Sequence, residues 1–179
     1  MRRYALLALG IAALWVGSAW TARDRDGERR ARLHERGMGH LRRWMDERRR
    51  DVEDMAMMAM WTDSSNMTHM KMQEMYRGLP VMGGEMIMHM NADGDMYAMT
   101  DNMVPAFRVE RAPRLTRRQA VEEAIRAYAC GDCFTDKPQV RLVAMRHGED
   151  DHIVYEVRLS RMDGSADTAM PVYYVDAHD

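Results

Sequence analysis

From Met55 onward the sequence alternates with a period of two, and this pattern limits what the chain can fold into. The run Met86-Ile87-Met88-His89-Met90 places methionine at every second position, and Met70-Lys71-Met72-Gln73 follows the same rule. Residues two apart on a strand lie on one face of a sheet. The pattern therefore predicts antiparallel strands with one buried face. The predicted strands lie near 55–61, 67–76, 82–90 and 96–103.

Turn-forming residues separate these alternating runs. Asp93-Gly94 lies in a short polar segment and is a strong hairpin signal. Arg77-Gly78-Leu79-Pro80 is predicted to turn the chain, and Pro80 is expected to make that turn rigid. Gly83 and Gly84 are expected to serve backbone geometry in a turn or bulge. Together with the alternation, these signals predict an antiparallel meander.

The second half of the sequence predicts one helix packed on a three-stranded antiparallel sheet. Thr116 and Gln119 have the spacing of a capping box, so we expect a helix over 116–129. Three alternating runs follow, and polar turn-forming segments separate them. These runs lie at 140–147, 152–160 and 170–176. The expected fold class is therefore α+β, with two lobes built on antiparallel sheets.

The N-terminal part has a different character. Residues 1–22 combine two arginines with an almost unbroken apolar run, which is typical of a signal peptide. The alternative is an uncleaved anchor, because the apolar run is near the lower length limit for a membrane span. Residues 23–54 are dense in Arg, Asp and Glu and predict a charged helix or flexible linker. Either interpretation of 1–22 makes the protein secreted or periplasmic, with no membrane contact except through that segment.

Charge and motif content argue against two classes of function. Charged residues make up 30% of the 179 residues, but the formal net charge is only −2. The chain therefore lacks the basic footprint of a nucleic-acid-binding protein. The motif His-Glu-x-x-His, which places two zinc-binding imidazoles and a carboxylate base on one helical face, does not occur in the sequence. We therefore expect no catalytic residues, no enzyme activity and no cofactor.

The 21 methionines have two interpretations. Thioether and imidazole groups suit Cu(I), but methionine also fills hydrophobic cores. The candidate copper ligands are His69, Met70, Met72, Met88, His89 and Met90. Alternation favours core packing, because His89 points away from the face that Met88 and Met90 share. We therefore expect no tight Cu(I) or Zn(II) site.

Cys130 and Cys133 form a Cys-x-x-Cys motif that follows the predicted helix. Redox motifs of this kind lie at the start of a helix, where the helix dipole lowers the pKa of the thiol. A short local disulfide in an exported protein is therefore the preferred interpretation.

Residues 68–85 resemble the FTP motif of fungalysin and thermolysin propeptides. They combine an aromatic-containing strand, a Gly-x-Pro-Val turn and a Gly-Gly pair, and a strand with a histidine and an Asp-Gly hairpin follows. The second half resembles a PepSY domain in its opening helix, its Tyr-Glu-Val strand and its final Tyr-Val-Asp-Ala strand. The residues that carry both resemblances are Arg77, Gly78, Pro80, Val81, Gly83, Gly84, His89, Asp93, Gly94, Tyr155, Glu156, Tyr174 and Asp176.

This resemblance implies an organisation and a function. An FTP-like lobe is expected at 55–105 and a PepSY-like lobe at 113–179. The implied protein is a secreted propeptide-like binding module that acts as a folding chaperone or inhibitor of a thermolysin-like metallopeptidase, in cis or in trans. One alternative is a metallopeptidase precursor that lacks its catalytic domain. Another is an exported methionine-rich protein that binds copper or buffers oxidants.

Overall fold

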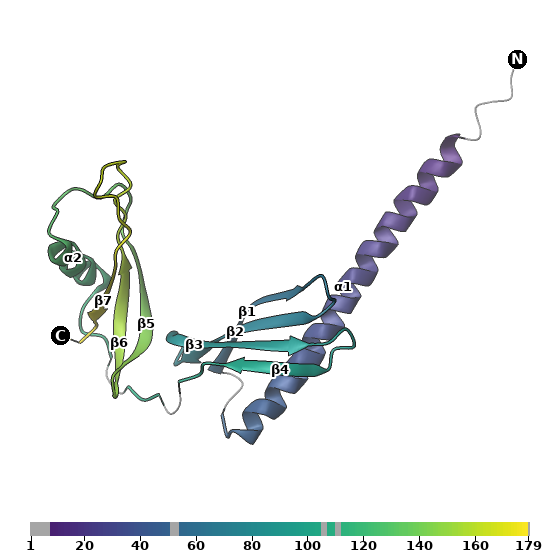
Figure 1. Ribbon diagram of the computed structural model, residues 1–179, viewed down its shortest axis with the longest axis horizontal. Coiled ribbons are helices and arrows are strands. Elements are labelled where there is room, and N and C mark those ends of the chain that lie inside the picture. Colours follow the sequence, from purple (N-terminus) through teal and green to yellow (C-terminus); the bar gives the residue numbers. More distant parts are fainter. Residues whose placement is uncertain (1–7, 51–53, 105–106, 110–111, 179) are drawn as a thin grey trace, which may run out of the picture. The chain divides into compact units, whose positions relative to one another are not determined.

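The computed structural model describes residues 8–50, 54–104, 107–109 and 112–178. Within these residues lie two helices, α1 (Ala8–Glu47) and α2 (Arg117–Tyr128), and seven strands (Figure 1). The strands are β1 (Met55–Thr62), β2 (Thr68–Tyr76), β3 (Leu79–Met90), β4 (Met96–Asp101), β5 (Gln139–His147), β6 (Asp150–Arg158) and β7 (Val172–Asp176). The predicted α+β class is therefore confirmed. Neither described helix is both long enough and apolar enough for a candidate membrane span. Residues 1–7 of the predicted signal segment lie outside the described residues.

The strands pair in an order that the sequence predicted only in part. The order is β1-β2-β3-β5-β6-β7, and β4 also pairs with β3. β5, β6 and β7 form the expected antiparallel arrangement. One pairing differs from the prediction, because β3 and β5 are parallel where Val81 lies opposite Ala144. Alternation shows which residues share a face, but it does not show which strands far apart in the sequence become neighbours.

The connection between β2 and β3 is shorter than the turn predicted from the sequence. Arg77 and Gly78 have φ values of 49° and 81°. Positive φ at both central residues is typical of a two-residue hairpin turn, whose twist matches that of the flanking strands. Pro80 therefore lies in β3 and not in the turn, which corrects the expectation for that residue. Proline is tolerated near the start of a strand, where its missing N–H need not leave a gap in the ladder.

Gly83 interrupts the alternation of β3. Val81 is buried, and the next buried positions are Gly84, Met86, Met88 and Met90. The step from Val81 to Gly84 is one residue longer than the regular step of two, and Gly83 has a φ of 77°. An extra residue with positive φ is the signature of a β-bulge. The bulge allows both Val81 and the methionines that follow it to be buried.

The described residues form two compact units. The first joins Met1–Val52 with Met60–Met70 and Met88–Met99, and the second joins Glu53–Ala59 with Lys71–Ile87 and Thr100–Asp179. The β2–β3 hairpin contributes residues to both units, so neither unit is a continuous segment of the chain.

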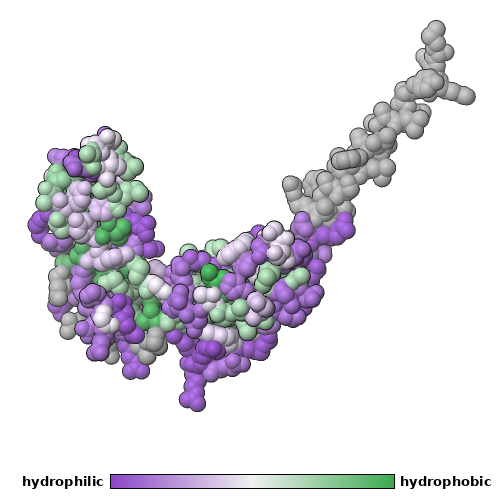
Figure 2. Space-filling model, in the orientation of Figure 1, coloured by the Kyte–Doolittle hydropathy of each residue, from purple (hydrophilic) through white to green (hydrophobic). Residues whose placement is uncertain are grey.

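In the first unit, α1 buries a narrow apolar stripe. The stripe consists of Leu33, Gly37, Leu41, Trp44 and Met45. Their spacing of three or four residues puts them on one face of the helix. Gly37 lies so close to the sheet that a Cβ atom there would overlap the Met70 side chain and contact Met90. Hydrophilic residues predominate on the visible surface of the C-terminal half of α1 (Figure 2). The described part of 23–54 is thus mainly a packed helix.

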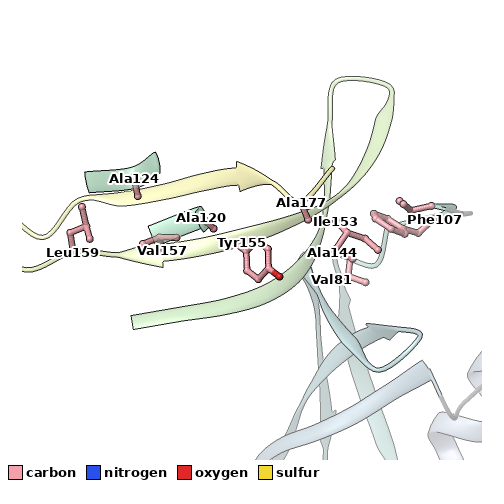
Figure 3. Close-up of a cluster of buried hydrophobic side chains, with 11 residues drawn as sticks. Val81, Phe107, Ala120, Ala124, Ala144, Ile153, Tyr155, Val157, Leu159 and Ala177 are labelled. Atoms are coloured by element: carbon pink, nitrogen blue, oxygen red, sulfur yellow. The ribbon is translucent and has the colours of Figure 1, made fainter. Parts of the chain in front are cut away.

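In the second unit, α2 covers one face of the β5–β7 sheet. Ala120 and Ala124 of α2 lie over Tyr155 and Val157 of β6 (Figure 3), and the small alanines allow close packing. The predicted capping box is confirmed, because Thr116 N donates to Gln119 Oε1 at 2.8 Å and the Gln119 N–H donates to the Thr116 hydroxyl. This arrangement leaves the opposite face of the β5–β7 sheet without a covering helix from the second unit.

Candidate functional site

The face of the β5–β7 sheet opposite α2 brings together two of the residues singled out from the sequence. Glu156 on β6 lies opposite Tyr174 on β7 and opposite Arg141 on β5. Their neighbours Val157 and Tyr173 point to the other face, into the core beneath α2. Period-two alternation therefore separates a core face from a face that is available for contacts.

Glu156 is the buried centre of this face. Its side chain is only 1% exposed, and both carboxylate oxygens accept hydrogen bonds from arginines. Arg141 Nη2 donates to one oxygen at 2.8 Å, and Arg158 Nε donates to the other at 2.6 Å. Both arginine side chains are about half exposed, so their remaining N–H groups are accessible to a partner.

The pKa of Glu156 reflects two opposing effects. Burial opposes ionisation of the carboxyl group, but the hydrogen bonds and charges of Arg141 and Arg158 outweigh it and lower the pKa. The carboxylate is thus ionised at neutral pH. It holds the two guanidinium groups in fixed positions on the sheet face.

Two depressions adjoin this cluster. One of about 350 Å³ is lined by Gln139, Val140, Arg141, Glu156 and Arg158. A second, of about 520 Å³, shares Gln139 and Arg158 with the first and extends to Met170 and Val172. The second depression therefore has a charged wall and an apolar wall.

Exposed apolar side chains follow β7 along the same face. Tyr174 is 46% exposed, and Val172 and Met170 are also exposed. Within the described strands, β7 pairs only with β6 and so forms an edge of the sheet. We use the term β7 surface for Arg141, Glu156, Arg158, Met170, Val172 and Tyr174. Aromatic and arginine side chains beside a sheet edge suit the binding of a protein or an extended peptide.

Tyr155 and Asp176 have contacts that are structural. Tyr155 lies in the core, and its hydroxyl donates to the Leu115 carbonyl at 2.9 Å. Asp176 accepts from His152 Nδ1 at 2.8 Å and from the backbone N–H of His178. Burial opposes ionisation of Asp176, but these hydrogen bonds prevail and lower its pKa. Tyr155 thus links β6 to the segment before α2, and Asp176 links the end of β7 to β6.

The glycine pair of the FTP-like segment accommodates a buried carboxylate. A Cβ at Gly84 would come within 2.7 Å of Glu74 Oε2, so the glycine leaves space for that side chain. Glu74 is 2% exposed and accepts from the Val104 N–H at 2.7 Å. The Gln73 amide donates to the carbonyls of Val81 and Gly84 at 2.7 and 3.0 Å. These contacts favour a structural role for this part of the motif.

The Asp93-Gly94 hairpin contacts α1. Gly94 has a φ of 86°, and its carbonyl accepts from His40 Nε2 at 3.0 Å. Arg36 forms an ion pair with Asp95 at 2.6 Å in the same turn. The hairpin predicted from the sequence therefore serves in the first unit as a docking point for the helix.

The six candidate copper ligands divide between two faces of their strands. Met70, Met72, Met88 and Met90 are buried, and His69 and His89 lie on the opposite face. The two imidazole rings contact each other. The structure therefore does not bring the thioethers and the imidazoles together. Cys130 and Cys133 form a disulfide directly after α2, with their Cα atoms 5.7 Å apart.

Sequence analysis missed several residues that shape these sites. Arg141 and Arg158 were not singled out as partners of Glu156, and Asp63 and Glu74 were not considered. Arg158 lies two positions after Glu156 on one strand, so alternation alone placed it on the same face. Arg141 is on a different strand, and its position depends on a register that a single sequence does not give.

Comparison with known families gives a match in the β1–β4 region. Residues 60–103 match the family model described as Fungalysin/Thermolysin Propeptide Motif. This range covers the end of β1 and all of β2, β3 and β4.

Two curated relatives show how far the similarity extends. "Bacillolysin" of Brevibacillus brevis is 27% identical over 119 residues, which cover 62% of this chain and 22% of the relative. "Thermolysin" of Alicyclobacillus acidocaldarius subsp. acidocaldarius is 24% identical over 141 residues, which cover 71% of this chain and 24% of the relative. The chain thus spans about a quarter or less of the length of these relatives. The resemblance to the propeptide region of thermolysin-like peptidases is confirmed.

A solved structure, "Bacillus megaterium YpeB C-terminal domain", also matches with a TM-score of 0.39 and 14% sequence identity. The match covers 82% of this chain and 60% of that one.

Proposed function

We propose that this protein is an exported propeptide-like binding module that assists the folding of a thermolysin-like metallopeptidase, inhibits the peptidase, or does both. The observation that carries the proposal is the match of residues 60–103 to the propeptide motif. The similarity to bacillolysin and thermolysin supports the choice of peptidase class. The module acts in cis when it is joined to a peptidase and in trans when it is a separate chain.

We further propose that the β7 surface is the contact for the peptidase. Tyr174 and the two arginines are of the residue types that carry most binding energy in protein interfaces. Arg141 and Arg158 are held in place by Glu156, so binding need not order two free side chains. The sheet edge at β7 offers backbone groups to an extended segment of the partner.

The proposal is tested by measuring two effects of the purified full chain on a peptidase: inhibition of hydrolysis and assistance of refolding. A mature thermolysin-like peptidase is titrated with the chain while hydrolysis of a small peptide substrate is followed. In parallel, the same peptidase is unfolded and allowed to refold with and without the chain. We expect a lower hydrolysis rate, a higher refolding yield, or both. If the chain changes neither quantity at a large molar excess over the peptidase, the proposed function is wrong.

A matched pair of variants tests the surface separately from the function. Tyr174→Ala removes an exposed aromatic side chain from the β7 surface, and Tyr97→Ala removes one from β4 in the first unit. We expect Tyr174→Ala to weaken the effect on the peptidase by about tenfold or more, as for a central interface residue. Tyr97→Ala should leave it unchanged. Equal effects of the two variants would contradict the assignment of the β7 surface.

A further inference from the structure

His69 on β2 and His89 on β3 meet on the strand face opposite the buried methionines. Their Nδ1 atoms are 2.7 Å apart, and their ring planes are inclined by 80° with centroids 5.0 Å apart. Both residues belong to the first unit. The two rings therefore share a hydrogen bond between neighbouring strands.

Asp63 fixes the orientation of His69. Its carboxylate accepts from His69 Nε2 at 3.1 Å and also accepts from the backbone N–H groups of Ser65 and Met67. A carboxylate only accepts, so Nε2 of His69 carries the proton, and in the neutral ring Nδ1 presents a lone pair. Trp61 stacks on the other side of the ring, with centroids 5.1 Å apart. His69 is thus held by a carboxylate and an aromatic ring, the same support that metal-binding histidines receive.

The distance between His69 Nδ1 and His89 Nδ1 is closer to that expected for ligands at right angles than to that expected for tetrahedral ligands. With metal–imidazole bonds of about 2.05 Å, ligands at right angles lie roughly 2.9 Å apart, and ligands at a tetrahedral angle lie roughly 3.3 Å apart. The observed 2.7 Å is closer to the right-angled arrangement, which is typical of square-planar Cu(II). An ion that binds here replaces the hydrogen bond between the rings, and both rings turn so that their Nδ1 lone pairs face the ion.

We propose that His69 Nδ1 and His89 Nδ1 form a two-nitrogen site for Cu(II), with Asp63 as the positioning residue. Among the described residues, no three His, Cys, Asp or Glu side chains form a metal-binding group, so water completes the coordination. His89 moves its ring proton from Nδ1 to Nε2 when the ion binds, and copper keeps its oxidation state. This site differs from the methionine–histidine Cu(I) set weighed from the sequence, because it uses no thioether.

Electron paramagnetic resonance of the untagged full chain with added Cu(II) provides the main test. We expect one bound ion per chain, with pulsed spectra that show coupling to two imidazole rings. His69→Gln and His89→Gln should each lower the affinity at least tenfold. Asp63→Asn should weaken Cu(II) binding by about 10- to 100-fold, which is typical when a residue that hydrogen-bonds to a metal-binding histidine is changed. His147→Gln, which changes an exposed histidine at the end of β5, should have no effect.

Either of two results from the binding measurements would overturn the proposal. One is a wild-type spectrum that shows coupling to fewer than two imidazoles, a result that does not depend on any variant folding. The other is equal loss of affinity in His147→Gln and His69→Gln. Trp61 gives a second readout, because bound Cu(II) beside it should quench its fluorescence. Trp61→Phe should remove the quenching and retain the ion, and persistence of the full quenching would place the ion elsewhere.

Discussion

At the scale of single residues, Glu156 shows how a charged side chain can lie in an otherwise open sheet face. Two arginines from β5 and β6 neutralise and cover it, so the carboxylate is nearly excluded from water without being unpaired. Removing one partner of such a buried pair leaves an uncompensated group, which destabilises more than the pair itself stabilises. The stability of the β5–β7 sheet should therefore depend on the ionisation of this residue.

The pH dependence of stability tests this role. Because the folded-state pKa of Glu156 is below its ordinary value of 4.5, the unfolded chain binds more protons at pH values between the two. The stabilisation is present above pH 4.5 and is lost as the pH falls through the folded-state pKa. Glu156→Gln should lower the free energy of unfolding by about 1–2 kcal/mol at pH 7 and by less below the folded-state pKa.

Urea unfolding of both proteins across this pH range measures the difference. Glu149→Gln, in the exposed β5–β6 turn, is the control and should follow the wild-type curve. A constant difference between wild type and Glu156→Gln at all pH values would show that ionisation of Glu156 is not the cause.

At the scale of elements, the close approach of α1 to the sheet depends on a glycine in the middle of the helix. Glycine in a helix interior is unfavourable relative to alanine by about 1 kcal/mol. Gly37 offsets this by allowing Met70 and Met90 to fill the space that a Cβ would occupy. The close packing of α1 against β2 and β3 therefore depends on the absence of a side chain at residue 37.

Two alanine substitutions in the same helix should have opposite effects. Gly37→Ala should destabilise the protein by about 1–3 kcal/mol, because the added methyl group overlaps the buried Met70 side chain. Gly39→Ala meets only the end of Arg43 at 3.9 Å and should stabilise the helix by up to about 1 kcal/mol. Thermal unfolding followed by circular dichroism measures both. Stabilisation by Gly37→Ala would contradict the packing of α1 on the strand methionines.

The strands and α2 could be predicted because each is indicated by residues that are close together in the sequence. Alternation indicated every strand to within a few residues, and the Thr116 capping box marked the start of α2. The Val81–Ala144 pairing and the contact between His69 and His89 depend on register, which a single sequence leaves open. Pro80 was misplaced because Arg77-Gly78 alone completes the turn. The buried residues of α1 recur at helical spacing in the sequence, but that spacing does not show which strand residues they contact.

At the scale of the whole molecule, the described methionines range from buried to exposed, and the two extremes form a buried group and an exposed group. Met45, Met70, Met72, Met86, Met88 and Met90 are buried, whereas Met57, Met58, Met96, Met162 and Met170 are exposed. The exposed group is accessible to oxidants, and its oxidation to sulfoxide is reversible. Oxidation of the buried group would introduce a polar group into the core.

Mild peroxide treatment should separate the two groups. We expect peptide mass spectrometry to show oxidation of the exposed group first, with the circular dichroism spectrum unchanged. The buried group should react at comparable rates only after denaturant is added. Early oxidation of Met88 or Met90 in the native protein would contradict the burial of these side chains.

The buried strand methionines also affect the conformational entropy of folding. A methionine side chain loses roughly 1.5–2 kcal/mol of rotamer freedom when it is buried, and isoleucine or leucine loses about 0.5–1 kcal/mol. Over the five buried strand methionines the extra entropic cost is about 5 kcal/mol, which is comparable to the entire net stability of a small domain. A ligand that binds only the folded form stabilises it by mass action and so offsets part of this entropic cost.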